Sequence, residues 1–135
     1  MSGPAATHVH YETAIMTFHV EIVLKGRDFA VTEDIVVPNV DVKSMDDAAV
    51  RTVLVEILRA MARAEDPKSP PDREIVLQGF SWIVEPEKDD VVIAIEIPMG
   101  AAVAGPFAIG QAELDAMIGR VLRSERQAWM PGTIH

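Results

Sequence analysis

Hydrophobic and polar residues alternate in the first part of the chain. In residues 13–25 the apolar side chains fall at every second position, which places them on one face of a β-strand. This face consists of Ala14, Met16, Phe18, Val20, Ile22 and Leu24. A turn containing Gly26 follows, and a second apolar run at residues 29–37 ends at Pro38. The pattern predicts a hairpin of two antiparallel strands.

The hydrophobic period changes to that of a helix in residues 44–65. Apolar residues recur there at intervals of three and four, so they form one stripe along an α-helix. The stripe consists of Val50, Val53, Leu54, Ile57, Leu58 and Met61. Ser44 is a suitable N-cap, and Asp46 and Asp47 place negative charge near the positive helix N-terminus. We therefore expect an amphipathic helix that begins at Ser44 and packs on a sheet.

Three prolines in residues 66–72 end this helix, and a second pair of strands is expected after them. Residues 74–85 and 90–97 are rich in Ile, Val, Phe and Trp, and they flank a turn at residues 86–89. The second of these strands is apolar on both faces apart from Glu96, as expected of a covered strand. Residues 99–110 are predicted to be a loop of small residues, and residues 111–126 a second amphipathic helix.

The order strand, strand, helix thus occurs twice, which predicts a two-layer α+β sandwich with a four-stranded, mainly antiparallel sheet. A β-grasp arrangement, in which a helix crosses between two hairpins, fits the same order and stays open as the alternative. A chain of 135 residues has the length of one domain. We expect a flexible N-terminus at residues 1–10, a single domain at 11–126 and a C-terminal tail at 127–135.

The charge of the chain argues against nucleic-acid and membrane partners. Lys and Arg number 12, Asp and Glu number 21, and the formal net charge is −9. This charge repels phosphate groups. No uncharged apolar run reaches the roughly 18 residues that a membrane-spanning helix needs, and the N-terminus lacks the pattern of a signal peptide. These features predict an acidic, cytoplasmic protein that binds neither nucleic acid nor membrane.

The chain lacks the motifs of the common catalytic and cofactor sites. It contains no cysteine, which excludes disulfides, thiolate nucleophiles and cysteine-ligated metals. Residues 99–110 match neither a P-loop nor a dinucleotide-binding motif, and no serine lies in a G-x-S-x-G context. His8 and His10 would share one face of a strand but have no third ligand nearby in the sequence. No cofactor or metal is therefore expected.

Two titratable residues are weak catalytic candidates. His19 lies two residues from Glu21 on one face of the first strand, and a histidine beside a carboxylate can act as an acid/base pair. Glu96 is a lone carboxylate in an apolar strand, and a buried carboxylate can serve as a general base. The alternative for each is an ordinary solvent-facing residue of a strand.

Excess apolar surface on the second hairpin is the strongest indication of function. Phe80, Trp82 and Val84 alternate onto one face, which must be covered by the second helix, by the C-terminal tail or by another subunit. Trp129 and Met130 give the tail two apolar anchors. We predict a homodimer that buries this face, because symmetric dimers are the commonest oligomers.

Two functions are consistent with these features. The first is a non-catalytic accessory or protein-interaction module, with the homodimer or another protein as its partner. The second is a small-molecule-binding protein or enzyme with a pocket between the sheet and the second helix. Gly100, Gly105 and Gly110 then mark a candidate ligand loop or lid, because backbone amides before a helix can hold an anion. We favour the first, because the chain has excess apolar surface and no catalytic motif.

Overall fold

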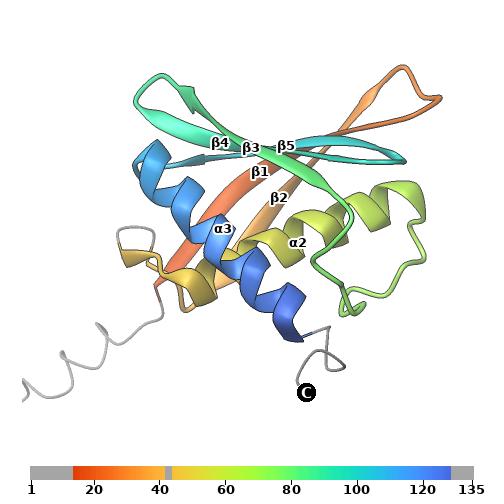
Figure 1. Cartoon of the computed structure of the whole chain (residues 1–135). Coiled ribbons are helices and arrows are strands. Elements are labelled where there is room, and N and C mark those ends of the chain that lie inside the picture. Colours follow the sequence, from red (N-terminus) through yellow and green to blue (C-terminus); the bar gives the residue numbers. More distant parts are fainter. Residues whose placement is uncertain (1–13, 42–43, 129–135) are drawn as a thin grey trace, which may run out of the picture.

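The computed structural model describes residues 14–41 and 44–128. These residues form a five-stranded antiparallel sheet and two helices that both lie on one side of it (Figure 1). The elements are β1 (Ile15–Leu24), β2 (Ala30–Pro38), α2 (Asp47–Glu65), β3 (Ser81–Glu87), β4 (Asp90–Ile97), β5 (Gly100–Phe107) and α3 (Gln111–Ala128). The predicted α+β class is confirmed, with five strands in place of the expected four.

Strand β1 buries the face that its alternating sequence predicts. Met16, Phe18, Val20, Ile22 and Leu24 are all buried beneath the helices. Strand β2 pairs with β1 in the expected antiparallel hairpin. Because the side chains of a strand point to alternate faces, this one buried set fixes which side of the sheet the helices cover.

Helix α2 begins later than predicted because Asp46, and not Ser44, is its N-cap. The Asp46 side chain accepts a 2.9 Å hydrogen bond from the backbone amide of Ala49, which satisfies a free amide of the first turn. The amide of Ser44 donates instead to the carbonyl of Asp41, so Ser44 belongs to the preceding turn. The helix then runs to Glu65, and its apolar stripe is buried against the sheet.

The main correction concerns residues 99–110, which contain a central strand and not a loop. Strand β5 lies between β1 and β4, so the sheet order is β2-β1-β5-β4-β3. A Cβ atom on Gly100 would lie only 2.4 Å from the carbonyl oxygen of Val23, so glycine is required for this close pairing. The predicted four-stranded sheet and repeated strand-strand-helix order are therefore replaced by strand-strand-helix-strand-strand-strand-helix.

The strand expected from residue 74 begins only at Ser81. Gly79 has a φ of +79°, which turns the chain just before the strand. Leu77 is buried in the hydrophobic core from this irregular segment, so its apolar character reflects packing and not strand structure. The guanidinium of Arg59 donates to the carbonyl of Arg73 and so holds the segment to α2.

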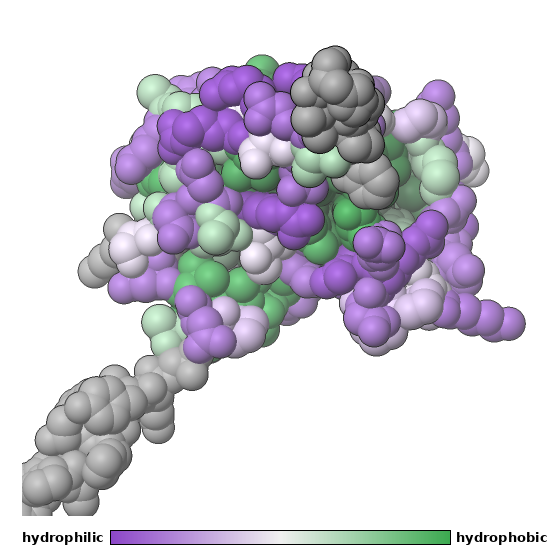
Figure 2. Space-filling view, turned by 60° about the horizontal axis from the view of Figure 1, so that its bottom comes forward, coloured by the Kyte–Doolittle hydropathy of each residue, from purple (hydrophilic) through white to green (hydrophobic). Residues whose placement is uncertain are grey.

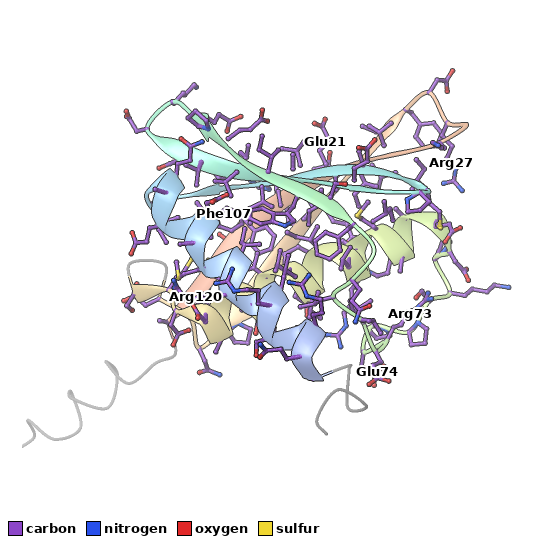
Figure 3. All side chains as sticks on the ribbon, in the orientation of Figure 1. Glu21, Arg27, Arg73, Glu74, Phe107 and Arg120 are labelled. Atoms are coloured by element: carbon purple, nitrogen blue, oxygen red, sulfur yellow. The ribbon has the colours of Figure 1, made fainter. Side chains whose placement is uncertain are left out.

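The two helices are joined by ion pairs on their solvent side. The Arg120 guanidinium of α3 makes two 2.9 Å hydrogen bonds to the Asp47 carboxylate of α2, and Arg51 pairs with Glu125 at 2.9 Å. These hydrogen bonds lower the pKa of Asp47 and raise the pKa of Arg51. Phe107 fills the space between sheet and helices, with its ring 5.1 Å from that of Phe18 (Figure 3).

Neither helix of the described residues is long and apolar enough to cross a membrane. The flexible N-terminus expected at residues 1–10, including His8 and His10, lies outside the described residues. The same holds for residues 129–135 of the expected tail, with Trp129 and Met130.

The central position of β5 predicts opposite effects for two glycine-to-alanine substitutions. Gly100→Ala should destabilise the protein by about 1–3 kcal/mol, because the added Cβ collides with the backbone of β1. Gly119→Ala should stabilise it by about 0.5–1 kcal/mol, because Gly119 lies inside α3 and its Cβ would meet only the flexible end of Arg123. Urea unfolding measures both. Equal stability of Gly100→Ala and the wild type would contradict the position of β5.

The Asp47–Arg120 pair predicts a pH-dependent contribution to stability. The pKa of Asp47 is lowered from its ordinary value of 3.8, so the folded state favours the charged form. The contribution is therefore present above pH 3.8 and lost as the pH falls through the lowered pKa. Asp47→Asn should lower the urea midpoint at about pH 7 and leave it nearly unchanged at about pH 2.

Two further variants control for this effect. Arg120→Gln should cause a similar loss, and the double variant should lose little more than either single one, because both remove the same interaction. Asp115→Asn, at an exposed position of α3 outside these pairs, should shift the midpoint little at either pH. Additive losses in the double variant would contradict the coupling.

Candidate interaction surface

The face of the sheet opposite the helices has no covering layer in the described part of the chain (Figure 1). We call the side chains that point outward from the strands on this side the open face. Of the eight large hydrophobic side chains that are exposed among the described residues, five lie on it. They are Ile15, Val23, Val36, Ile83 and Val103. A solvated sheet face normally carries polar residues, so this concentration needs an explanation.

Strand pairing arranges the open face in rows across the sheet. One row, from β2 to β3, consists of Thr32, Glu21, Val103, Ala94 and Ile83. The next row consists of Ala30, Val23, Ala101, Glu96 and Ser81. The small side chains of Ala94 and Ala101 leave an open depression of about 380 Å³ over β3, β4 and β5. The centre of the open face is therefore apolar and hollowed.

Carboxylates border this apolar centre. Glu21 and Glu96 lie on β1 and β4, on either side of β5, and both are exposed. Figure 3 shows Glu21 on the side of the sheet away from the helices. Glu85 is exposed on β3. None of the five strands contains a lysine or arginine, so the open face is anionic.

The nearest cations lie in the turns between strands. Lys25 follows β1, and Lys88 lies in the turn between β3 and β4. Arg27 donates a 3.1 Å hydrogen bond to the carbonyl of Ala64 at the end of α2, which directs it toward the helix side. The cationic groups near the open face are thus at its margins.

His19 pairs with a different residue from the one the sequence suggested. Its Nδ1 lies 2.6 Å from Oδ1 of Asp34, which is its cross-strand neighbour on β2. Residues directly opposite on paired strands are closer than residues two apart on one strand, which explains why Asp34 and not Glu21 is the partner. Their side chains are 66% and 76% exposed, so this pair lies on the surface and not in a pocket.

Glu96 and the three glycines of the candidate ligand loop do not come together. Glu96 is exposed on the open face, between Ala101 and Ser81 of the neighbouring strands. Gly100 begins β5, Gly105 lies in β5 opposite His19, and the carbonyl of Gly110 accepts a hydrogen bond from the amide of Leu114 at the start of α3. Residues 99–110 therefore form a strand and a helix start, and not a lid. Within the described residues, no three His, Asp or Glu side chains are grouped to hold a metal.

The proposed interface residues of the second hairpin point toward the helices. Val84 is buried, and Phe80 and Trp82 are partly buried against the core. Trp82 and Leu122 of α3 line the same small hollow, so the second helix covers this part of the sheet within one chain. Ile83, which points the other way, is the exposed residue of this strand. The position of α3 determines which face of β3 stays open.

The helix side combines polar and apolar surface. Figure 2 shows that hydrophilic residues cover much of it, with hydrophobic residues in patches between them. One cleft of about 330 Å³ lies between α2 and residues 73–78, and its large apolar side chains are Leu58, Met61, Ile75, Val76, Phe80, Ile97 and Met99. This cleft differs from the open face because Leu58, Met61, Ile75 and Phe80 are buried or partly buried in it.

A scan against protein-family models and searches of curated proteins and of solved structures found no match to the chain. The open face is therefore interpreted from its own residues and charges.

The exposed apolar side chains predict that a hydrophobic dye binds to the open face of the native protein. Ile83→Thr combined with Val103→Thr should lower the fluorescence of Nile red, an uncharged dye that the carboxylates do not repel, by more than about half while changing stability little, because Thr preserves the β-branch at exposed positions. The matched control combines Val76→Thr with Met99→Thr, which removes exposed apolar groups beside the α2 cleft. A larger effect of the control pair would place the dye in the cleft and contradict the prediction.

Proposed function

We propose that this chain is a non-catalytic interaction module that binds a protein partner through the open face. The observation that carries the proposal is the set of five exposed large hydrophobic residues on one uncovered face of the sheet. Three of these residues, Val23, Ile83 and Val103, lie in two neighbouring rows, and exposed apolar patches on soluble proteins are typical of interaction sites. The polar groups on this face, a surface His19–Asp34 pair and separated carboxylates, provide no evident catalytic arrangement.

The size of the open face is sufficient for a small interface. Five strands about 4.8 Å apart, each seven to ten residues long, span an area on the order of 500 Å². A standard interface buries roughly 800 Å² on each partner. A partner that covered the open face and its margins would approach that size, whereas one confined to the central depression would bind weakly.

A second copy of the chain is the simplest partner. In a two-fold dimer the open face would meet the same surface of the other copy. Each copy would bring Glu21, Glu85 and Glu96, and no strand carries a lysine or arginine to balance them. Like charges opposite one another destabilise a sheet contact. We therefore propose a homodimer that is weak at low ionic strength and tightens as salt screens this repulsion.

Sedimentation velocity over a concentration series tests the homodimer. At about 1 M salt, where the screening length is about 3 Å, the average mass should rise above the 14.7 kDa of one chain; at about 10 mM it should rise less. The Ile83→Thr and Val103→Thr pair should weaken the dimer by about 100-fold, because two apolar groups are lost from each copy. The Val76→Thr and Met99→Thr pair is the control and should behave as the wild type. A mass of 14.7 kDa at every concentration and both salt levels would exclude the dimer.

Small-molecule binding is the second candidate function, and the α2 cleft is the observation that favours it. Its volume of about 330 Å³ and its mainly apolar lining are within the usual range of ligand pockets. Near the start of α3 the space between the sheet and the helix, where the sequence suggested a pocket, is filled by Phe107, Leu114 and Ile118, all fully buried; near its end an open hollow of about 350 Å³ lies between Trp82 and Leu122. The open face is the stronger candidate, because it gathers most of the exposed large hydrophobic residues of the described chain.

A further inference from the structure

The charge pattern of the open face indicates what kind of partner it fits. Glu21 on β1 and Glu96 on β4 flank β5, whose outward residues Ala101 and Val103 form the apolar centre. Strands β1 and β4 are two strand spacings apart, which is about 10 Å. An α-helix with its side chains is about 10–12 Å across. A helix lying over β5 would therefore place its two flanks over the two carboxylates.

From this geometry we infer that the open face binds a cationic amphipathic helix, with a stripe of large apolar side chains flanked on both sides by lysine or arginine. The inference rests on the proposed interaction function and specifies the partner. The apolar stripe lies in the depression above Ala94 and Ala101, where small residues leave about 380 Å³ for larger side chains. The flanking cations meet Glu21 on one side and Glu96 on the other.

Other partners fit the charges and the sheet less well. The homodimer proposed above uses the same face but brings like carboxylates to the contact, so a cationic helix should displace the second copy at low salt; nucleic acids and anionic lipids carry phosphates that the acidic face repels. Addition of a strand at the sheet edges is also disfavoured. Edge strand β2 carries Glu33, which points to the helix side and pairs with Arg63 at 2.7 Å, and edge strand β3 contains Pro86, which cannot donate to a ladder.

Synthetic peptides of defined pattern test the inference. The probe is a fluorescein-labelled helical peptide of about five turns with a leucine stripe between two rows of lysine. One control peptide has the same composition in an order that breaks the stripe, and another replaces every lysine with glutamate. Fluorescence anisotropy at about 0.15 M salt should show that the Leu/Lys helix binds at least about tenfold more tightly than the scrambled peptide, with no binding of the Leu/Glu helix.

Charge reversal on the protein separates the open face from net charge. Glu21→Lys with Glu96→Lys should weaken binding of the Leu/Lys helix by at least about tenfold. The control, Glu74→Lys with Asp115→Lys, changes the net charge equally, and its residues belong to the loop before β3 and to α3. Figure 3 shows Glu74 near the bottom of the molecule, on the helix side, and Glu21 at the top. The control pair should change the affinity by less than about threefold.

A single cysteine can locate the bound peptide, because the chain contains none. Bound peptide should slow the reaction of a maleimide with Ala101→Cys at the centre of the open face, and leave its reaction with Asp115→Cys on α3 unchanged. Glu21→Gln with Glu96→Gln, which removes charge without reversing it, should weaken binding by an intermediate amount. The far-UV circular dichroism and urea midpoint of each variant establish that it is folded.

Several outcomes would overturn the inference. Equal weakening by the two charge-reversal pairs would mean that the peptide responds only to net charge, and equal affinity of the scrambled peptide would exclude recognition of a helix stripe. If the Leu/Lys helix does not bind but the chain dimerises through Ile83 and Val103, the partner is wrong and the open-face function stands. If neither the peptide nor a second copy binds, the inference and the proposed function both fail.

Discussion

The close packing of β5 between β1 and β4 is the constraint on which the rest of the structure depends. This strand joins the β1–β2 hairpin to the β3–β4 hairpin, and no other strand pairing connects them within residues 14–41 and 44–128. It approaches β1 so closely that Gly100 has no room for a Cβ atom. Toward the helices it presents Ala102 and Ala104, both buried, which leave space for the larger side chains of the helix layer. The small residues of β5 therefore let the two hairpins form one sheet and leave room for the large side chains of the core.

The same small residues shape the opposite side of the sheet. Because β5 carries Ala101 and Val103 outward, and β4 carries Ala94, the open face is hollow where the larger β-branched and aromatic residues common in strands would fill the space. The larger apolar residues, Val23 and Ile83, lie on strands to either side. The compact residues that let β5 fit between its neighbours therefore also create the depression. The small residues of β5 thus account both for the close strand packing and for the shape of the candidate surface.

The sequence predicted the elements whose residues differ clearly in polarity. Strand β1 alternates large apolar residues with polar ones, and α2 repeats its apolar residues at helical intervals, so each shows its period locally. Strand β5 shows no period, because alanine and glycine occupy both of its faces. Its partners are distant in the sequence, and only the pairing with β1 and β4 reveals that it is a strand.

The candidate surface could be predicted only in part, for the same reason. The alternation of Trp82 and Ile83 shows that they lie on opposite faces of β3, but the choice of the exposed one depends on α3, which follows almost thirty residues later. The pairing of His19 with Asp34 likewise depends on the register of the hairpin.

The charged residues of the helices and those of the open face are arranged differently. Arg51, Arg63 and Arg120 are neutralised by carboxylates around the helices, whereas Glu21 and Glu96 border an apolar surface without a strand-borne cation. A partner of the open face must therefore satisfy both its hydrophobic centre and its anionic margins.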